Sequence, residues 1–361
     1  MKWYFCWCQE TEFRTDHNWE ELIKISVESA LINTNLEPHF IYDGNPSNLT
    51  EYLENKGVII HYHRISFEKE INEFTTDSQS RSVARGAFLR FDIPLIEKDD
   101  KYVLYTDADV IFLPGKDIFK GYYPDFLAAA PQFDRGSIRD MNSGVMIINV
   151  DSWKEKRDEL INFTLNNLHV GLDQEILREY LGKDYLLLPD RFNWKPYWGL
   201  NPDAAIIHWH GPKPVTINHW LNDKDLNIPH SWRILLEQGE SSYKEYIKQH
   251  DFFLNLIEQK RDISPVEIEI NNLNNGFLSG EIKNIEHPDS PICIKLKTNS
   301  GEEIYYEFDE IKRKIDNLSI FNFNIPFEFS IGTTLLLAED LALREVLFNF
   351  GEKRFRYIKL S

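Results

Sequence analysis

The 361-residue sequence has little cysteine and a deficit of positive charge, and each shortage excludes a class of protein. Only Cys6, Cys8 and Cys293 occur, and an odd, small number of cysteines in a chain of this length indicates a reducing compartment. Acidic residues outnumber basic ones by 58 to 40, which gives a net charge of −18. This charge argues against nucleic acid or an anionic membrane surface as the main partner. It does not exclude a phosphorylated ligand, because a local cation can reverse the local field.

Long apolar runs are missing as well. The N-terminal run WYFCWC is too short for a secretory signal or a membrane span, and no other stretch approaches the length of a span. We therefore expect a cytoplasmic, soluble protein, with at most a peripheral contact with the membrane. Hydrophobic residues make up 42% and aromatic residues 14% of the sequence, which predicts a globular protein with a sizeable core.

Up to about residue 210, segments typical of strands alternate with segments typical of helices. The expected strands are 2–8, 38–44, 58–65 and 102–113, and the expected helices between them are 18–31, 48–57 and 82–91. Asn18 and Glu21 have the spacing of a helix cap. This order predicts an α/β fold with a mainly parallel sheet covered on both faces. Ligands of such sheets bind beyond the carboxyl ends of the strands.

The last hundred residues have a different pattern. From about residue 262, apolar and polar residues alternate in VEIEI, ICIKLK and FNFNIPFEFSI, with turn signals such as NNG and NSG between the runs. This predicts an antiparallel β-sandwich. We therefore expect a catalytic domain over 1–261, which includes a helical segment at about 231–260, and an accessory β domain over 262–361. The accessory domain could bind an acceptor or join two copies as a homodimer.

Two carboxylates near the end of a buried strand need a compensating charge. Asp107 and Asp109 lie in YVLYTDADVIF, and residues i and i+2 of an extended segment point the same way. Carboxylates about 4 Å apart repel by about 1 kcal/mol in water and about 4 kcal/mol at an effective dielectric of 20. A shared proton, a divalent cation or exposure to solvent would relieve this repulsion, and the position favours a cation such as Mg²⁺ or Mn²⁺. The second Asp-x-Asp, Asp223 and Asp225, has polar neighbours and indicates a solvated loop.

Two further side chains could complete such a site. His208 ends the apolar run AAIIH, and Lys213 follows a Gly-Pro turn. An imidazole can join a mixed oxygen and nitrogen site, which Mn²⁺ tolerates better than Mg²⁺ does. Taken alone, His208 is more typical of a core histidine. The ammonium of Lys213 can reach a phosphate as a point charge.

Two polar segments could contribute the remaining contacts. Asn142, Ser143 and Gly144 precede an expected strand at 145–150, where small residues either permit close approach of a ligand or form an ordinary turn. Asp173 and Gln174 begin an expected helix. Asp173 could cap this helix, or the two side chains could lie at the rim of a pocket.

Five segments resemble, in their order and rough spacing, the glycogenin-like and LgtC-like retaining glycosyltransferases of family 8. They are VLYTDADVIF, NSGVMIIN, LDQEIL, LLLPDRFNW and IIHWHGPKP, and the resemblance covers about residues 1–220. It implies a GT-A fold, Mn²⁺ (or Mg²⁺), and UDP-glucose or UDP-galactose as the donor of a hexose. It also implies transfer with retention to a glycan, glycolipid or glycoprotein acceptor.

The resemblance also implies a role for each candidate residue. The metal ligands would be Asp107, Asp109 and His208. The catalytic residues would be Asp173 and Gln174, with Gln174 next to the anomeric carbon. The residues that bind the donor would be Arg90, Asp107, Asn142, Ser143, Gly211 and Lys213. Retention would follow from displacement at the front face, since Gln174 is not a carboxylate.

The sequence departs from the family at two places. Val215 stands where the family has Trp after Lys-Pro, and the segment around Gln9 and Glu10 does not match the family's nucleotide-binding segment, which leaves the uracil contacts unassigned. A phosphatase of the haloacid dehalogenase type also uses Asp-x-Asp, but its motif requires Thr or Val where Ile111 stands. A carbohydrate-binding or scaffold protein with a decayed GT-A domain is the second alternative.

Overall fold

The computed structural model describes residues 1–12, 17–74, 78–113 and 119–258, and strands of the C-terminal region between residues 266 and 357. The chain divides into two compact units, Met1–Leu254 and Asn255–Ser361. Every site residue predicted above lies in the first unit. Among the described residues, no helix combines the length and the apolar character needed to cross a bilayer.

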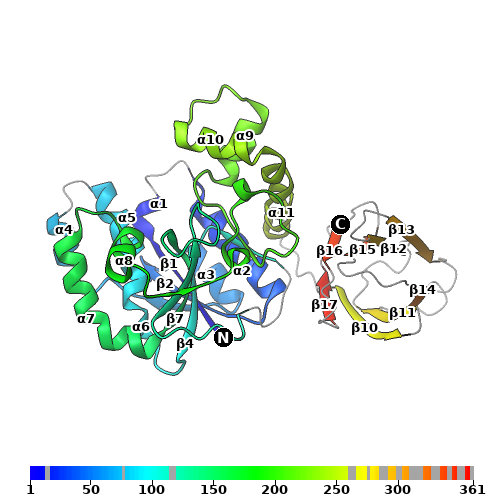
Figure 1. The fold of residues 1–361 in the computed structure, drawn as a ribbon, viewed down its shortest axis with the longest axis horizontal. Helices are drawn as coiled ribbons and strands as arrows, with labels where there is room; N and C mark the ends of the chain where they lie inside the picture. Colours follow the sequence, from blue (N-terminus) through cyan, green and yellow to red (C-terminus); the bar gives the residue numbers. More distant parts are fainter. Residues whose placement is uncertain are drawn as a thin grey trace. The chain divides into compact units, whose positions relative to one another are not determined.

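A seven-stranded sheet forms the centre of the first unit, in the order β3-β2-β1-β4-β7-β6-β8 (Figure 1). Its strands are β1 (Lys2–Cys8), β2 (Glu37–Asp43), β3 (Ile59–Tyr62), β4 (Tyr102–Thr106), β6 (Leu127–Pro131), β7 (Met141–Asn149) and β8 (Leu186–Leu187). β7 runs antiparallel to both of its neighbours, whereas the other pairings in this sheet are parallel. The predicted α/β class with a mainly parallel sheet is confirmed, and the sheet is consistent with a GT-A fold.

The central strands of this sheet are buried on both faces. In β1, Tyr4 and Cys6 pack into one apolar cluster, while Trp3, Phe5 and Trp7 pack into a second cluster on the opposite face. Successive side chains of a strand point to opposite faces, so a strand that is covered twice must be apolar throughout. The run WYFCWC meets this requirement.

The helices divide between the two faces, as Figure 1 shows. The first cluster lies under α4 (Glu68–Phe74), α5 (Ser78–Phe88), α6 (Ile93–Ile96), α7 (Val150–Asn167) and α8 (Asp173–Leu181). The second cluster lies under α2 (Trp19–Asn33) and α3 (Asn48–Asn55). The remaining described helices are α1 (Gln9–Glu12), α9 (Pro214–Asn222), α10 (His230–Gln238) and α11 (Glu240–Glu258), and 3₁₀ turns lie at Leu89–Asp92, Asp190–Asn193 and Pro196–Trp198. The last four residues of α11 belong to the second unit.

The sequence predicted the start of one helix correctly and the start of another too late. The side chain of Asn18 accepts a hydrogen bond from the Glu21 N–H at 3.1 Å, which confirms the predicted cap of α2. The helix predicted from residue 82 begins earlier, at Ser78, and passes through a 3₁₀ turn into α6. Pro94 lies in the first turn of α6, where its missing N–H costs no helical hydrogen bond.

The predicted strand 102–113 is wrong as one continuous strand. β4 ends at Thr106, and β5 (Val110–Phe112) pairs antiparallel with β9 (Ile206–His208) in a separate two-stranded sheet. The bend has its own hydrogen bonds, because the N–H of Asp107 donates to the carbonyl of Gly144 at 2.8 Å and the carbonyl of Asp109 accepts from Trp209 at 3.0 Å. These two hydrogen bonds extend the β4–β7 and β5–β9 pairings by one residue each, so the backbone groups on either side of the bend have partners.

In the second unit, the described strands form two four-stranded sheets. One contains β14 (Ile320–Pro326), β11 (Phe277–Lys283), β10 (Val266–Asn274) and β17 (Arg354–Tyr357), and the other contains β13 (Glu303–Phe308), β12 (Ile292–Lys297), β15 (Thr334–Glu339) and β16 (Arg344–Leu347). Their pairings are antiparallel, as the two-residue alternation predicts. The domain boundary predicted between residues 261 and 262 lies outside the described residues.

Candidate functional site

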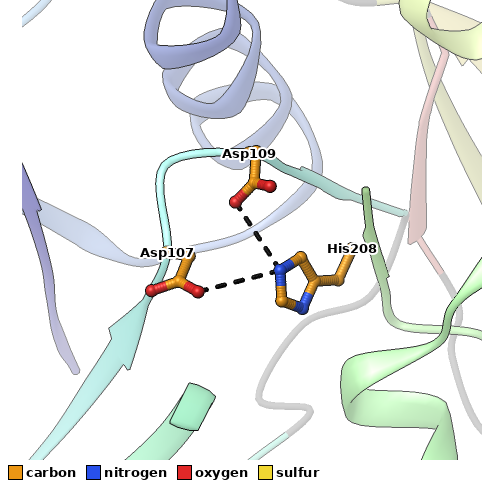
Figure 2. Close-up of side chains that lie close together, drawn as sticks. All are labelled: Asp107, Asp109 and His208. Carbon is orange, nitrogen blue, oxygen red and sulfur yellow. Dashed lines mark ion pairs between the residues drawn. The ribbon is translucent and has the colours of Figure 1, made fainter. Parts of the chain in front are cut away.

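Three elements bring the predicted metal ligands together at the carboxyl end of β4. Asp107 follows β4, Asp109 precedes β5, and His208 is the last residue of β9, where it pairs with Val110. The Nε2 atom of His208 lies 3.7 Å from Asp107 Oδ2 and 3.6 Å from Asp109 Oδ1 (Figure 2). The three potential ligand atoms all lie within 4.8 Å of one another.

Asp107 is held by its other oxygen. Oδ1 accepts hydrogen bonds from Arg90 Nη2 at 2.9 Å and from the Tyr105 hydroxyl at 3.0 Å. The guanidinium of Arg90 also stacks on the Tyr105 ring, 4.4 Å from the ring centroid. These contacts leave Oδ2 facing His208, as Figure 2 shows. The predicted donor-binding residue Arg90 thus contacts protein groups in this structure and orients Asp107.

Asp109 is held in a similar way. Its Oδ2 atom forms an ion pair with the Lys213 ammonium, and its Oδ1 atom faces His208. Burial alone would raise the pKa of Asp109, but the charge of Lys213, together with His208, outweighs burial and holds the pKa well below its ordinary value. Lys213 also donates to the carbonyl of Trp209 at 2.7 Å.

The donor set fits a divalent cation. Distances of 3.6 and 3.7 Å exceed a hydrogen bond, so the two carboxylate oxygens and the ring nitrogen converge without bonding to one another. Two anionic oxygens beside one nitrogen repel each other unless a positive charge lies between them. Such a mixed oxygen and nitrogen set suits Mn²⁺, and a purely oxygen set suits Mg²⁺ better.

Gly144 creates the space for this convergence. A Cβ atom added at Gly144 would lie 2.3 Å from His208 Cε1 and 2.8 Å from Asp107 Oδ2. The sequence left open whether Gly144 belongs to an ordinary turn or permits a close approach. The structure shows that the approaching group is the His208 ring.

Asn142, Ser143 and Gly144 lie within β7, whereas the sequence placed them before the strand. Because β7 runs antiparallel to β4, its first residues lie beside the end of β4. The hydroxyl of Ser143 donates to Asp173 Oδ2 at 2.7 Å, and Arg90 Nη1 lies 2.9 Å from the same oxygen. Asp173 therefore joins this polar group, and no hydrogen bond from its side chain caps α8. Burial raises the pKa of Asp173 by more than Arg90 lowers it.

Gln174 is oriented by β7 from one side and by Gln132 from the other. Its Oε1 atom accepts from Asn142 Nδ2 at 2.6 Å and from the Ser143 N–H at 3.2 Å. Its Nε2 atom donates to Gln132 Oε1 at 2.7 Å. The amide of Gln174 therefore has a defined direction.

Gly211 lies in the turn between β9 and α9. Its φ of 86° is in the left-handed region that favours glycine, and an added Cβ would lie 3.0 Å from Leu235 Cδ1. This turn leads to Lys213, directly before Pro214 in the first turn of α9, and so positions the ammonium beside Asp109.

Sequence reasoning missed two side chains of this region. Asn193 lies in the segment LLLPDRFNW without an assigned role, and its Oδ1 atom is 2.9 Å from His208 Nδ1. Gln132 has no recognisable sequence signal, yet it contacts both Gln174 and His210. The quoted motif could have indicated Asn193, whereas the place of Gln132 depends on the turn after β6.

A separate cavity of about 300 Å³ lies beyond the ends of β1, β2 and β3. Its lining residues are Gln9, Glu10, Tyr42, Asp43, Gly44, Asn45, Tyr62, His63, Arg64 and Arg85. These include the segment whose nucleotide contacts could not be matched in the sequence. The lining does not include the acidic pair or His208.

Comparison with known proteins gives distant similarities. No family model matches the sequence. General stress protein A of Bacillus subtilis (strain 168) is 27% identical over 183 residues, which are 44% of this chain and 61% of that protein. The chain thus spans less than two thirds of this curated relative.

Solved structures that are similar to this chain include those of three transferases. The apo form of the glycosyltransferase GlyE of Streptococcus pneumoniae TIGR4 is 17% identical and has a TM-score of 0.46, with 69% of this chain and 63% of that chain covered. The galactosyltransferase LgtC is 18% identical and has a TM-score of 0.46, with 65% and 100% covered. Mouse xyloside xylosyltransferase 1 is 13% identical and has a TM-score of 0.41, with 58% and 97% covered. Identities this low leave the reaction of this chain to be argued from its own residues.

Proposed function

We propose that this chain is a metal-dependent, retaining glycosyltransferase of family 8. It transfers a hexose, glucose or galactose, from a UDP-sugar to a glycan, glycolipid or glycoprotein acceptor. The observation that carries the proposal is the convergence of Asp107 Oδ2, Asp109 Oδ1 and His208 Nε2 on one small volume. The order of the five sequence motifs connects this volume with nucleotide-sugar chemistry.

The departing group in this reaction is a nucleoside diphosphate, whose charge must be stabilised as the glycosidic bond breaks. A divalent cation, Mn²⁺ or Mg²⁺, held by Asp107, Asp109 and His208 would supply most of this stabilisation. Lys213 adds a fixed positive charge. Its ammonium has three N–H donors, of which Asp109 and Trp209 take two, and the third can reach a phosphate oxygen. The turn at Gly211 lets the backbone approach the diphosphate.

The hydroxyls of the donor sugar need both donors and acceptors. Asn142, Ser143 and Asp173 offer them from β7 and from the start of α8, next to the acidic pair. Arg90 contacts Asp107 and Asp173 at 2.9 Å each. It therefore fixes the position of the proposed metal ligand relative to the proposed sugar-binding carboxylate. Arg90 therefore supports donor binding by orienting these two groups.

The amide of Gln174 places limits on how retention is achieved. Its oxygen already accepts two hydrogen bonds, from Asn142 and Ser143, and an amide oxygen is a weaker nucleophile than a carboxylate. We favour front-face displacement, in which the acceptor hydroxyl enters on the side from which the diphosphate leaves. Gln174 then contributes an oriented dipole next to the anomeric carbon, and Asp173 fixes the sugar.

A donor screen tests the proposal against its alternatives. The protein is incubated with UDP-glucose, UDP-galactose or phosphate esters, each with and without Mn²⁺. Release of UDP that requires both a sugar donor and Mn²⁺ supports the transferase. Release of phosphate from the esters would support the phosphatase instead. If no compound is turned over although UDP binds, the chain is a binding or scaffold protein.

The second unit would recruit the acceptor or join two copies of the chain, in a cytoplasmic protein. A chain cut near residue 262 separates these proposals. Loss of activity on polymeric acceptors, with activity on small acceptors retained, indicates recruitment. A change from dimer to monomer indicates assembly. If neither property changes, both roles are excluded.

A further inference from the structure

We propose that Asn193 is a positioning residue that fixes the tautomer of His208, with the ring proton on Nδ1 and the lone pair of Nε2 directed at the acidic pair. Asn193 is completely buried in the turn Asp190–Asn193, and its Oδ1 atom lies 2.9 Å from His208 Nδ1. A histidine that binds a metal must offer a lone pair, and its second nitrogen usually donates to a fixed acceptor. The tautomer is inferred from the hydrogen bonds alone, whereas its role in binding a cation rests on the proposed function.

The backbone of β7 fixes the direction of the amide next to Asn193. The N–H of Gly144 donates to Asn142 Oδ1 at 3.2 Å. A backbone N–H cannot donate to an amide nitrogen, so the oxygen of Asn142 must lie on this side. The other end of the same amide agrees, because Asn142 Nδ2 donates to the Gln174 oxygen, which also accepts from the Ser143 N–H.

The orientation of the Asn142 amide in turn determines the orientation of the Asn193 amide. Its Nδ2 atom lies 2.7 Å from Asn142 Oδ1. Since that oxygen is an acceptor, Asn193 must present its NH₂ group to Asn142 and its oxygen to His208. The oxygen of Asn193 can only accept, so Nδ1 of His208 must carry a proton. Two backbone N–H groups of β7 therefore determine which nitrogen of a histidine on β9 is free.

The surroundings of the ring strengthen this assignment. His208 is 2% exposed, and Gly144 leaves no room for the ring to shift in its direction, since an added Cβ would lie 2.3 Å from Cε1. With the proton on Nδ1, the free Nε2 atom faces Asp107 and Asp109. With the proton on Nε2, the ring would turn a lone pair to the oxygen of Asn193 and lose its ability to bind a cation.

The same chain of amides continues away from the acidic pair. Gln174 Nε2 donates to Gln132 Oε1, and Gln132 Nε2 lies 3.0 Å from His210 Nε2. The amides of Asn193, Asn142, Gln174 and Gln132 therefore have one common direction. Asn142 and Gln174 are proposed contacts of the donor sugar, so the orientation of the metal ligand and that of the sugar contacts depend on one network.

Histidine ¹⁵N NMR of the metal-free protein tests the assignment directly. The full chain is labelled at its 11 histidines, and the His208 signals are identified as those absent from His208→Gln. We expect a proton on Nδ1, the nitrogen that faces the Asn193 oxygen. A ring without a proton on Nδ1 in the wild-type protein would overturn the inference, whatever the variants do.

Two variants and a control test the role of Asn193. Asn193→Leu removes the acceptor at nearly constant volume, and we expect a mixture of tautomers and a loss of Mn²⁺ affinity of about 10- to 100-fold, measured by electron paramagnetic resonance. Asn193→Asp keeps an oxygen for Nδ1–H and should retain the tautomer and most of the affinity. Asn166→Leu, on the exposed face of α7, should behave as the wild type.

The outcomes separate this inference from the proposed function. If Asn193→Leu keeps both the tautomer and the affinity, Asn193 is not the positioning residue. If the NMR result holds and Mn²⁺ binds, but no UDP-sugar is turned over, the proposed reaction fails while the inference stands. If Asn193→Leu does not fold, the tautomer of the wild-type protein and the affinity of Asn193→Asp still decide.

Discussion

Buried carboxylates lie near both ends of β4, and their hydrogen-bond partners differ between the two ends. Before the strand, Glu97 is 2% exposed and accepts hydrogen bonds from Lys2, Tyr4 and the N–H groups of Asp99 and Asp100, at 2.6 to 3.0 Å. Both of its oxygens thus have donors at hydrogen-bond distance. This is how a buried carboxylate serves a fold.

At the other end of the strand, Asp107 and Asp109 each give one oxygen to a protein cation and turn the second to a histidine nitrogen 3.6 to 3.7 Å away. Three potential metal ligands therefore face one another here, whereas each oxygen of Glu97 faces a hydrogen-bond donor. The difference distinguishes a carboxylate that stabilises the fold from a pair that is arranged for a ligand. The proposed cation site depends on this difference in hydrogen-bond partners.

The largest effect on activity is expected from Asp109→Asn. The loss of one charged ligand should reduce Mn²⁺-dependent UDP release by more than about 100-fold, since even residues behind the ligands contribute about 10- to 100-fold in affinity. The melting temperature should also fall, because the neutral amide leaves the largely buried Lys213 ammonium without its charged partner. The rates are therefore compared at a temperature at which the variant is folded. Asp225→Asn, in the exposed second Asp-x-Asp, is the matched control. Equal rates in the two variants would remove Asp109 from the site.

A smaller effect is expected from Gly144→Ala. The added methyl group would lie 2.3 Å from the His208 ring and 2.8 Å from Asp107 Oδ2, so at least one of these two ligands must shift. We expect a loss of Mn²⁺ affinity of about 10-fold or more, measured by titration. Gly86→Ala in α5, where the nearest atom would be 3.4 Å away, should bind Mn²⁺ normally. Unchanged affinity in Gly144→Ala would show that the position of His208 does not control binding.

Unlike the changes at the acidic pair, Glu97→Gln is expected to lower stability and to leave turnover unchanged. Hydrogen bonds to a charged group are worth about 1.5–3 kcal/mol, so we expect a loss of about 2 kcal/mol in the free energy of unfolding. The rate of UDP release at a permissive temperature should equal that of the wild type. Exposed Glu51→Gln serves as the control in thermal unfolding. A stable Glu97→Gln with a reduced rate would contradict the distinction between the two ends of β4.

The smallest effect is a dependence of stability on pH. Burial would raise the pKa of Glu97, but the donors around it, with Asp100 and Tyr4 foremost, hold the pKa at about 2, below its ordinary value of 4.5. A lowered pKa in the folded state contributes stability that is complete above about pH 4.5 and is lost as the pH falls through about 2. The difference in stability between the wild type and Glu97→Gln should therefore shrink over this range. A constant difference would mean that the charge of Glu97 is not what stabilises the fold.

The sequence predicts the fold class and the three candidate metal ligands that the structure brings together, because both depend on local patterns. A doubly covered strand such as β1 must be apolar throughout, and strand–helix alternation requires a mainly parallel sheet. The carboxylates at 107 and 109 were recognisable because two like charges interrupt an apolar run. His208 was recognisable because it ends one.

The rest depends on contacts between distant parts of the chain. The break between β4 and β5 exists because β5 pairs with β9, which lies almost a hundred positions later. Arg90 contacts Asp107 and Asp173 through the sheet, and nothing near Arg90 in the sequence indicates this. Asn193 orients His208 through an amide whose direction is determined by the backbone of β7. Such relations follow from packing and cannot be read from spacing.

Titration of the 361-residue protein with Mn²⁺ in the presence of UDP, followed by electron paramagnetic resonance, is the most direct test of the cation site. We expect one Mn²⁺ bound per wild-type chain, at least about tenfold weaker binding in Asp109→Asn, and wild-type binding in Asp225→Asn. Absence of bound Mn²⁺ in the wild type, or equal binding in the two variants, would contradict a cation site formed by Asp107, Asp109 and His208.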